Sequence, residues 1–398
     1  MNTLLVWSIA IATIAGILFR PRRWPEAVWT CLGAGLLVLL GLLPPRAAWQ
    51  AVQKGTDVYL FLTGMMLLAE LARREGVFDW LASHAARAAR GSRARLFALV
   101  YGVGILVTVF FSNDATAVVL TPAVYAAVKK AKTAARPYLL ICAFIANAAS
   151  FVLPISNPAN LVVYGKQLPP LLPWLKVFFL PSLASIFLTF LVLRWISRRE
   201  LKGKAEDAVG ARTLSSEGRR AAWGMVLFGA VLISASLLGM DLGLPTLASA
   251  LAAMAIATPG RGKAIAAIVG AVSWSVLPMV AGLFVLVDAL RVAGALHGVD
   301  RALNAFSRLP ALAGSLAASF SVAFQEAAVP EHIRPALLIG VDLGPNLSVT
   351  GSLATLLWLI ALRREGEHIS GRTFLRAGLW VMPPALVVAV LALVLAAR

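Results

Sequence analysis

Long apolar runs alternate with short basic or polar segments along almost the whole chain. Most of these runs approach or exceed the roughly 20 residues that a helix needs to cross a bilayer. They cover residues 2–19, 25–43, 57–72, 96–128, 137–164, 173–193, 221–238, 245–259, 264–290, 311–329, 333–360 and 373–396. The pattern predicts an all-α polytopic membrane protein with about ten transmembrane helices.

Composition and charge narrow the class of protein. Of the 398 residues, 60% are hydrophobic and 14% are charged, whereas soluble domains are nearer half apolar and a quarter charged. A disordered chain, a disulfide scaffold and a cytosolic enzyme are therefore excluded. The net charge of +18 would suit nucleic acid, but Lys and Arg concentrate in the cytoplasmic loops of membrane proteins. We expect a multi-pass protein of the cell inner (plasma) membrane, embedded in the lipid bilayer, with no nucleic acid as partner.

Basic segments also divide and orient the chain. The longest polar stretch, 194–220, holds eight basic and four acidic residues. It is predicted to be a cytoplasmic linker between an N-terminal membrane repeat, 1–193, and a C-terminal inverted membrane repeat, 221–398. The same rule places further basic segments in the cytoplasm, at 20–23, 73–95, 129–136, 261–263 and 363–376.

One apolar run begins and ends on the cytoplasmic side. About thirty residues separate Arg95 from Lys129, a length that suits a hairpin entering and leaving by the same face. Its middle is the polar triplet Ser112-Asn113-Asp114. A broken backbone at this depth is tolerated only where it lines a cavity or packs in protein. The sequence therefore predicts a re-entrant hairpin here.

The two halves of the chain resemble each other. Residues 154–163 resemble residues 349–358, and three positions of the segment 61–81 recur 218 residues later: Gly64, Glu70 and Gly76 match Gly282, Asp288 and Gly294. An odd number of crossings before the linker would invert the second half. Inverted repeats with interrupted helices are typical of secondary transporters, while a generic duplication of membrane helices remains the simpler alternative.

The first of three polar clusters that interrupt apolar runs covers residues 112–116. An unpaired carboxylate in the middle of a membrane is costly, so Asp114 is expected to be paired, protonated or open to water. Each of these states suits a proton carrier. Alternatively, Asp114 caps the second arm of the hairpin, as Asp often does at helix starts.

The other two clusters are rich in helix-breaking and uncharged polar residues. The second cluster covers residues 154–160. Its Pro154 and Pro158 remove helix hydrogen bonds, and the alternative is an ordinary proline kink. The third cluster, 342–352, contains Asp342, which either carries a proton or balances an Arg. The uncharged hydrogen-bonding side chains of the two clusters are Ser156, Asn157, Asn160, Asn346, Ser348, Thr350 and Ser352.

Signatures of enzymes, metals and cofactors are absent from the sequence. There is no H-E-x-x-H motif, and residues 257–264 lack the first Gly and the final Ser or Thr of a phosphate-binding loop. Cys31 and Cys142 are too few for a thiolate metal site. The energy for transport is expected from an ion gradient or from a separate ATPase.

Three segments resemble the arsenite/antimonite efflux permeases, the ArsB family of the ion transporter superfamily. They read FFSNDATAVVLTP (110–122), SFVLPISNPANLVV (150–163) and IGVDLGPNLSVTGSLATLLWLIALRREG (339–366). The resemblance implies two inverted repeats, each giving a re-entrant hairpin and a broken helix to a transport domain held by a scaffold domain. It also implies export of trivalent arsenic or antimony in exchange for protons. The alternatives are a sodium/proton or dicarboxylate carrier of this superfamily, or the membrane channel of a pump driven by a cytosolic arsenite-stimulated ATPase.

The implied substrate matches the polar clusters. Trivalent arsenic is a small neutral trihydroxide at neutral pH, so it needs amide, hydroxyl and carbonyl partners more than charge. The residues expected to bind it are Asn113, Ser156, Asn157, Asn160, Asn346, Ser348, Thr350 and Ser352. Asp114 or Asp342 is expected to couple transport to protons.

The second hairpin departs from the family pattern. Relatives carry an Asn-Asn-Leu-Pro-like element at its tip, and residues 312–332 contain none. Measured against the first repeat, roughly 16 residues are missing near Phe324. Either the tip has been lost, in which event Glu326 could replace its amides, or the sequence omits a stretch. We favour omission, which predicts a spatial gap between Phe324 and Gln325.

Overall fold

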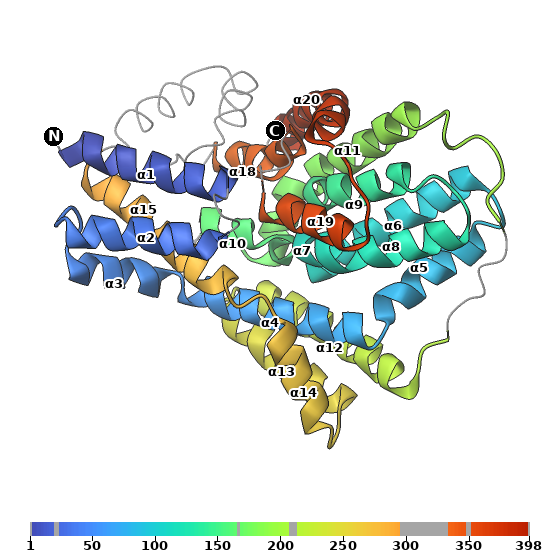
Figure 1. Ribbon diagram of the computed structural model, residues 1–398, viewed down its shortest axis with the longest axis horizontal. Coiled ribbons are helices and arrows are strands. Elements are labelled where there is room, and N and C mark those ends of the chain that lie inside the picture. Colours follow the sequence, from blue (N-terminus) through green and yellow to red (C-terminus); the bar gives the residue numbers. More distant parts are fainter. Residues whose placement is uncertain are drawn as a thin grey trace.

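A computed structural model describes residues 2–19, 24–164, 168–206, 213–294, 333–347 and 352–396. Apart from an isolated bridge between Ser92 and Lys204, the regular elements of these residues are helices (Figure 1). The predicted all-α class is confirmed. The expected gap between Phe324 and Gln325, and the second hairpin as a whole, lie outside the described residues.

Several of the described helices are long and apolar enough to cross a membrane. Those that qualify alone are α6 (Arg93–Phe111), α11 (Leu171–Ile196), α12 (Ser216–Leu237), α20 (Gly371–Ala396) and the stretch Gly262–Val292. A sixth span results if α3 (Pro45–Lys54) and α4 (Thr56–Arg74), which meet at 47°, count as one. Shorter apolar helices add to these: α1 (Asn2–Phe19), α2 (Glu26–Leu39), α9 (Arg136–Ala148) and α13 (Gly243–Ala257). The chain is therefore a multi-pass membrane protein.

One layer of the molecule combines α1–α4 with α12, α13, α14 (Gly262–Ala271) and α15 (Val276–Val292). A shift of 218 residues carries the first four helices onto the last four to within a few residues. The packing repeats as well, because α13 lies on α4 and α15 lies on α2. A Cβ atom on Gly64 would come within 2.7 Å of the Thr246 backbone, and one on Gly282 within 2.8 Å of the Thr30 backbone. Both glycines thus allow close helix packing at equivalent places.

The two sets of four helices run in opposite directions. Thr3, at the start of α1, donates a 3.0 Å hydrogen bond to the carbonyl just past the end of α15. At the same end, Lys54 pairs with Asp288 of α15 at 2.5 Å. The start of α12 lies at the other end, where a Cβ on Gly218 would be 2.8 Å from the carbonyl oxygen of Glu75, just past α4. The first set therefore starts at one end of this layer and the second set starts at the other.

The apolar run 264–290, expected to be continuous, is broken. Helix α14 ends at Ala271, Val272 is extended with ψ 141°, and α15 begins at Val276. The 218-residue shift places Ser273, inside this break, opposite Gly55, the residue between α3 and α4. The break is therefore explained by its equivalence to the junction between α3 and α4. No proline or strongly polar cluster in the local sequence accounts for it.

The second layer holds the polar clusters. It contains α5 (Val77–Ala88), α6, α7 (Asn113–Ala115), a π-helical turn (Thr116–Leu120), α8 (Thr121–Lys130), α9, α10 (Pro158–Tyr164), α11, α18 (Arg334–Leu343), α19 (Leu353–Arg364) and α20. Helices α11 and α20 pack along each other, and α19 packs on the π-helical turn and on α8 (Figure 1). Each layer thus takes elements from both halves of the chain.

The predicted hairpin is formed by α6 and the helices that follow it. Its chain breaks at Ser112, whose φ is 90°. The linker holds its two outer ends together: Ala205 N–H donates to the Gly91 carbonyl at 2.7 Å, and Glu206 N–H donates to the Ala131 carbonyl at 2.9 Å. Both arms therefore end on the side of the linker, as a re-entrant hairpin requires.

Candidate functional site

Ser112 organises the tip of the hairpin. Its hydroxyl accepts a 3.4 Å hydrogen bond from the Ala115 N–H and so caps the second arm. The hydroxyls of Thr108 and Thr116 lie 2.8 Å apart and join the two arms across the break. The cap is thus Ser112 rather than Asp114, and the Asp114 carboxylate is left for another role.

The second cluster breaks the helix between α9 and α10. Asn157 caps α10, since its Oδ1 accepts from the Ala159 N–H at 3.0 Å. Asn160 donates to three carbonyls that the break has freed, at 2.9 to 3.3 Å. Ser156 donates to the Val109 carbonyl at 3.0 Å and accepts from a backbone N–H at 3.1 Å. Ser156 and Asn160 therefore stabilise the broken backbone.

The third cluster meets the second in the interior. Asp342, near the end of α18, is 1% exposed, and its Oδ1 accepts a 2.7 Å hydrogen bond from the Asn157 amide. Asn346 accepts a 2.8 Å bond from the Asn147 amide of α9. Ser352 caps α19 by accepting from the Thr355 N–H at 3.1 Å. Within the described ranges Asp342 has no Arg or Lys partner, so these residues offer no support for its role as a counter-charge.

The clusters line a cavity of about 360 Å³ between the two layers. Helices α4 and α15 supply an apolar wall, which includes Leu62 and Phe284. The polar side chains of the lining are Asn113, Asp114, Asn147, Asn157, Asp342 and Ser352. As far as the described residues go, no Lys, Arg or His lines this cavity. It offers uncharged hydrogen-bonding groups together with two carboxylates.

The predicted site residues fall into three groups. Asn113, Asn157, Ser352 and the two aspartates line the cavity, whereas Ser156, Asn160 and Asn346 are buried behind its wall. Ser348 and Thr350 lie outside the described residues. Sequence reasoning missed Asn147, although the 195-residue shift that aligns 154–163 with 349–358 places it opposite Asp342.

Buried polar atoms without partners surround this site. Asn113 Oδ1, Asp342 Oδ2 and Asn346 Nδ2 are buried and form no hydrogen bond with the described part of the chain. A buried polar atom that stays unpaired costs about 1–3 kcal/mol. The two acceptors, which belong to residues that line the cavity, are therefore available to a ligand that donates hydrogen bonds, whereas Asn346 lies behind the wall.

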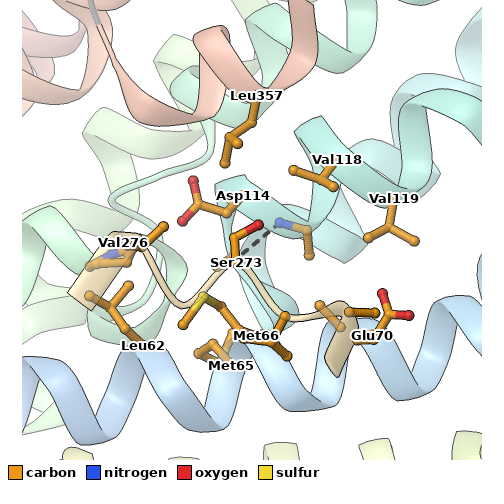
Figure 2. A pocket seen from close by; sticks show the side chains of 16 residues that line it. Leu62, Met65, Met66, Glu70, Asp114, Val118, Val119, Ser273, Val276 and Leu357 are labelled. Atoms are coloured by element: carbon orange, nitrogen blue, oxygen red, sulfur yellow. Dashed lines mark hydrogen bonds between the residues drawn. The ribbon is translucent and has the colours of Figure 1, made fainter. Parts of the chain in front are cut away.

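Asp114 also borders a second, smaller cavity of about 90 Å³. Figure 2 shows Asp114 above Ser273, which belongs to the break before α15, and Glu70 farther along α4. Ser112 contributes a further polar side chain to the lining, and Leu62 is shared with the larger cavity. Asp114 thus stands where the two cavities approach each other.

Cysteine side chains and possible groups of metal ligands can be located among the described residues. Cys142 is buried in α9 and Cys31 is exposed on α2, and neither lines a described cavity. In the described segments, no three His, Cys, Asp or Glu side chains gather closely enough to hold a metal ion.

Known proteins resemble this chain along nearly its whole length. The CitMHS citrate transporter family matches residues 9–362. The arsenical pump membrane protein of Escherichia coli K12 is 26% identical over an alignment of 433 residues that takes in 98% of both chains. The protein of the same name from Yersinia enterocolitica is also 26% identical, again over 98% of both chains. Because the first alignment is longer than the 398 residues of this chain, that relative contains residues with no counterpart here.

A solved structure shares the fold. The YdaH transporter of Alcanivorax borkumensis superposes with a TM-score of 0.56 over 92% of this chain and 97% of its own, at 17% identity. These relatives are membrane transporters and not enzymes, and the predicted resemblance to the arsenical pump membrane proteins is confirmed. The chain thus belongs to the CitMHS citrate transporter family, as a multi-pass membrane transporter of the arsenical pump type.

Proposed function

We propose that the protein exports trivalent arsenic and antimony hydroxides across the inner membrane in exchange for protons. The observation that carries this proposal is the lining of the larger cavity, where three Asn amides and the Ser352 hydroxyl accompany two carboxylates and no described cation. A neutral trihydroxide can donate to carboxylate and amide oxygens and accept from amide N–H groups. Its three hydroxyls match the mixed donors and acceptors of this wall.

Asn113, Asn147, Asn157 and Ser352 are the proposed substrate contacts among the described residues. The orphan oxygens Asn113 Oδ1 and Asp342 Oδ2 would accept hydrogen bonds from substrate hydroxyls. Because an unpaired buried acceptor is costly, a ligand that satisfies these oxygens gains affinity. Ser348 and Thr350 remain expected contacts on the basis of the sequence.

Asp114 is the better candidate for the proton carrier. It borders both cavities, and its carboxylate makes no hydrogen bond with the described residues, whereas Asp342 is held by Asn157. The second layer would move against the first and expose the site to either side in turn, and inverted repeats provide two such states. This proposal keeps the division into repeats 1–193 and 221–398 around the linker 194–220.

A citrate or dicarboxylate substrate suits the cavity less well. Carboxylates are usually bound by Arg, Lys or helix N-termini. The capped starts of α10 and α19 reach the described wall, but it also carries Asp114 and Asp342 and no described cation. The negative charges of these two carboxylates would repel an anionic substrate. Sodium is compatible with the two carboxylates, so sodium/proton exchange is the second candidate.

Reconstituted vesicles test the proposal. With an acidic lumen and no ATP, protons leaving through the protein should drive arsenite into the vesicles, and dissipating the pH gradient should stop this uptake. Labelled citrate and sodium, assayed in the same vesicles, identify the alternative substrates. Arsenite flux that appears only when an arsenite-stimulated ATPase and ATP are added would show a pump channel instead of an antiporter.

A further inference from the structure

We propose that the smaller cavity is the route by which the proton leaves Asp114 for the cytoplasm, with Glu70 as the acceptor at its far end. This inference rests on the proposed proton antiport and assigns a proton path to it. Glu70 would be a proton-transfer residue outside the substrate site, on the layer that carries no polar cluster.

The cavity follows one face of α4. Leu62, Met66 and Glu70 are spaced four residues apart, so they lie above one another on the helix, and all three line the cavity. Leu62 also lines the larger cavity. At 1.5 Å per residue, Glu70 lies about 12 Å along the helix from Leu62. The smaller cavity therefore leads away from the substrate site toward the end of α4.

The lining can support proton transfer through water. Besides the two carboxyl groups, the hydroxyls of Ser112 and Ser273 belong to it, and Figure 2 shows Ser273 between Asp114 and α4 in that view. A volume of about 90 Å³ has room for a few water molecules, which need such polar partners. A proton released by the Asp114 carboxyl passes to water and from water to the Glu70 carboxylate, and Asp114 is left ionised for the next cycle.

Glu70 connects the cavity to the surface. Its carboxylate accepts hydrogen bonds from Arg73 Nε at 2.7 Å and Nη2 at 2.5 Å. The Glu70 side chain is 13% exposed, whereas that of Arg73 is 52% exposed. Arg73 begins one of the basic segments assigned to the cytoplasm. A proton that reaches Glu70 is thus next to the cytoplasmic solvent.

Other charged groups lie near this end of α4. On α5, Asp79 acts electrostatically on Arg73. On α12, which also packs on α4, Arg220 pairs with Glu217 at 3.5 Å. Of the acidic residues at this end of α4, Glu70 is the one that lines the described cavity.

The internal repeat supplies a matched comparison. Asp288 occupies the position equivalent to Glu70, but it pairs with Lys54 of another helix and lines neither described cavity. An acidic residue at this repeat position is thus compatible with a purely structural ion pair. The contact with the cavity is what distinguishes Glu70.

The test separates proton release from substrate movement. Wild-type protein and the variants Glu70→Gln and Asp288→Asn are reconstituted, and uptake driven by a pH gradient is compared with arsenite counterflow at equal pH, which needs no proton release. Glu70→Gln should lower driven uptake at least tenfold and leave counterflow within twofold. Asp288→Asn should keep both rates within about twofold, and Glu70→Asp should restore part of the driven uptake.

Two results would overturn the proton path. One is driven uptake by Glu70→Gln within twofold of wild type. The other is a parallel loss of counterflow in Glu70→Gln, which would show that Glu70 only stabilises the helix end. If Glu70→Gln does not fold, Ala69→Phe narrows the same cavity with the carboxylate kept, and normal driven uptake there contradicts the path. Wild-type arsenite flux that never responds to pH would refute the antiport and the path together.

Discussion

The amide of Asn157 donates a 2.7 Å hydrogen bond to the carboxylate of Asp342, and this bond joins residues that lie 185 positions apart. Asn157 caps α10 after the first helix break. Asp342 lies in the last turn of α18, just before the second helix break. The two breaks therefore meet at one wall of the larger cavity. A substrate bound at this wall, as we propose, would contact both halves of the chain and so link their movements to its binding.

Replacing Asp342 by Asn should weaken substrate binding while the fold is kept. The new amide oxygen can still accept from Asn157. The Oδ2 acceptor, which has no described partner, is replaced by an uncharged NH2 donor. Hydrogen bonds to charged groups contribute about 1.5–3 kcal/mol, so we expect at least a tenfold rise in the arsenite Kd. Calorimetric titration of the purified variant measures this, with an unchanged Tm as the control for folding. A Kd within twofold of wild type would remove Asp342 from the substrate site.

Replacing Asp114 by Asn should separate coupling from binding. The variant keeps the size of the side chain and the cap made by Ser112, but it cannot release a proton. We expect uptake driven by a pH gradient to fall more than tenfold, while arsenite counterflow stays within twofold. Normal driven uptake in both Asp114→Asn and Asp342→Asn would refute a carboxylate proton carrier at these positions.

The positions of the three polar clusters could be predicted because polar groups in apolar runs need partners within a membrane. The sequence could not predict which of their side chains face the cavity. Asn160 turns toward the carbonyls freed by the helix break, since buried carbonyls require donors. In the sequence it is indistinguishable from Asn157, which faces the cavity.

Two features escaped a local search of the sequence but were present in its repeats. Asn147 is a single amide in an apolar run, and only its alignment with Asp342 marks it. The break before α15 contains Ser273 and no proline, and only its equivalence to Gly55 reveals it. Local composition carries little information at such positions, because the geometry is imposed by the packing of the duplicated helix against its neighbours.

Asn147 should therefore matter for both binding and stability. In Asn147→Ala, the cavity loses an amide, and the buried Asn346 loses the donor that bonds it at 2.8 Å. Leaving such an acceptor unpaired costs about 1–3 kcal/mol, so Tm should fall and arsenite affinity should drop several-fold. Ser150→Ala is the control, because that buried hydroxyl bonds only within its own turn and lines neither described cavity. Equal arsenite affinities for the two variants would contradict a substrate contact at Asn147.

The close approach of Gly378 in α20 to the backbone of Asn346 should fix the position of Asn346. A Cβ atom at this glycine would lie 2.0 Å from the Asn346 carbonyl oxygen, so Gly378→Ala must push the chain at Asn346 toward the cavity or separate α20 from it. At an open helical position, Gly→Ala would instead stabilise by up to about 1 kcal/mol, and Gly229 of α12, with nothing within 4 Å of its would-be Cβ, is the matched control. We expect Gly378→Ala to lower Tm and arsenite affinity together and Gly229→Ala to lower neither. A Gly378→Ala protein with normal affinity would show that the packing of α20 does not set the substrate site.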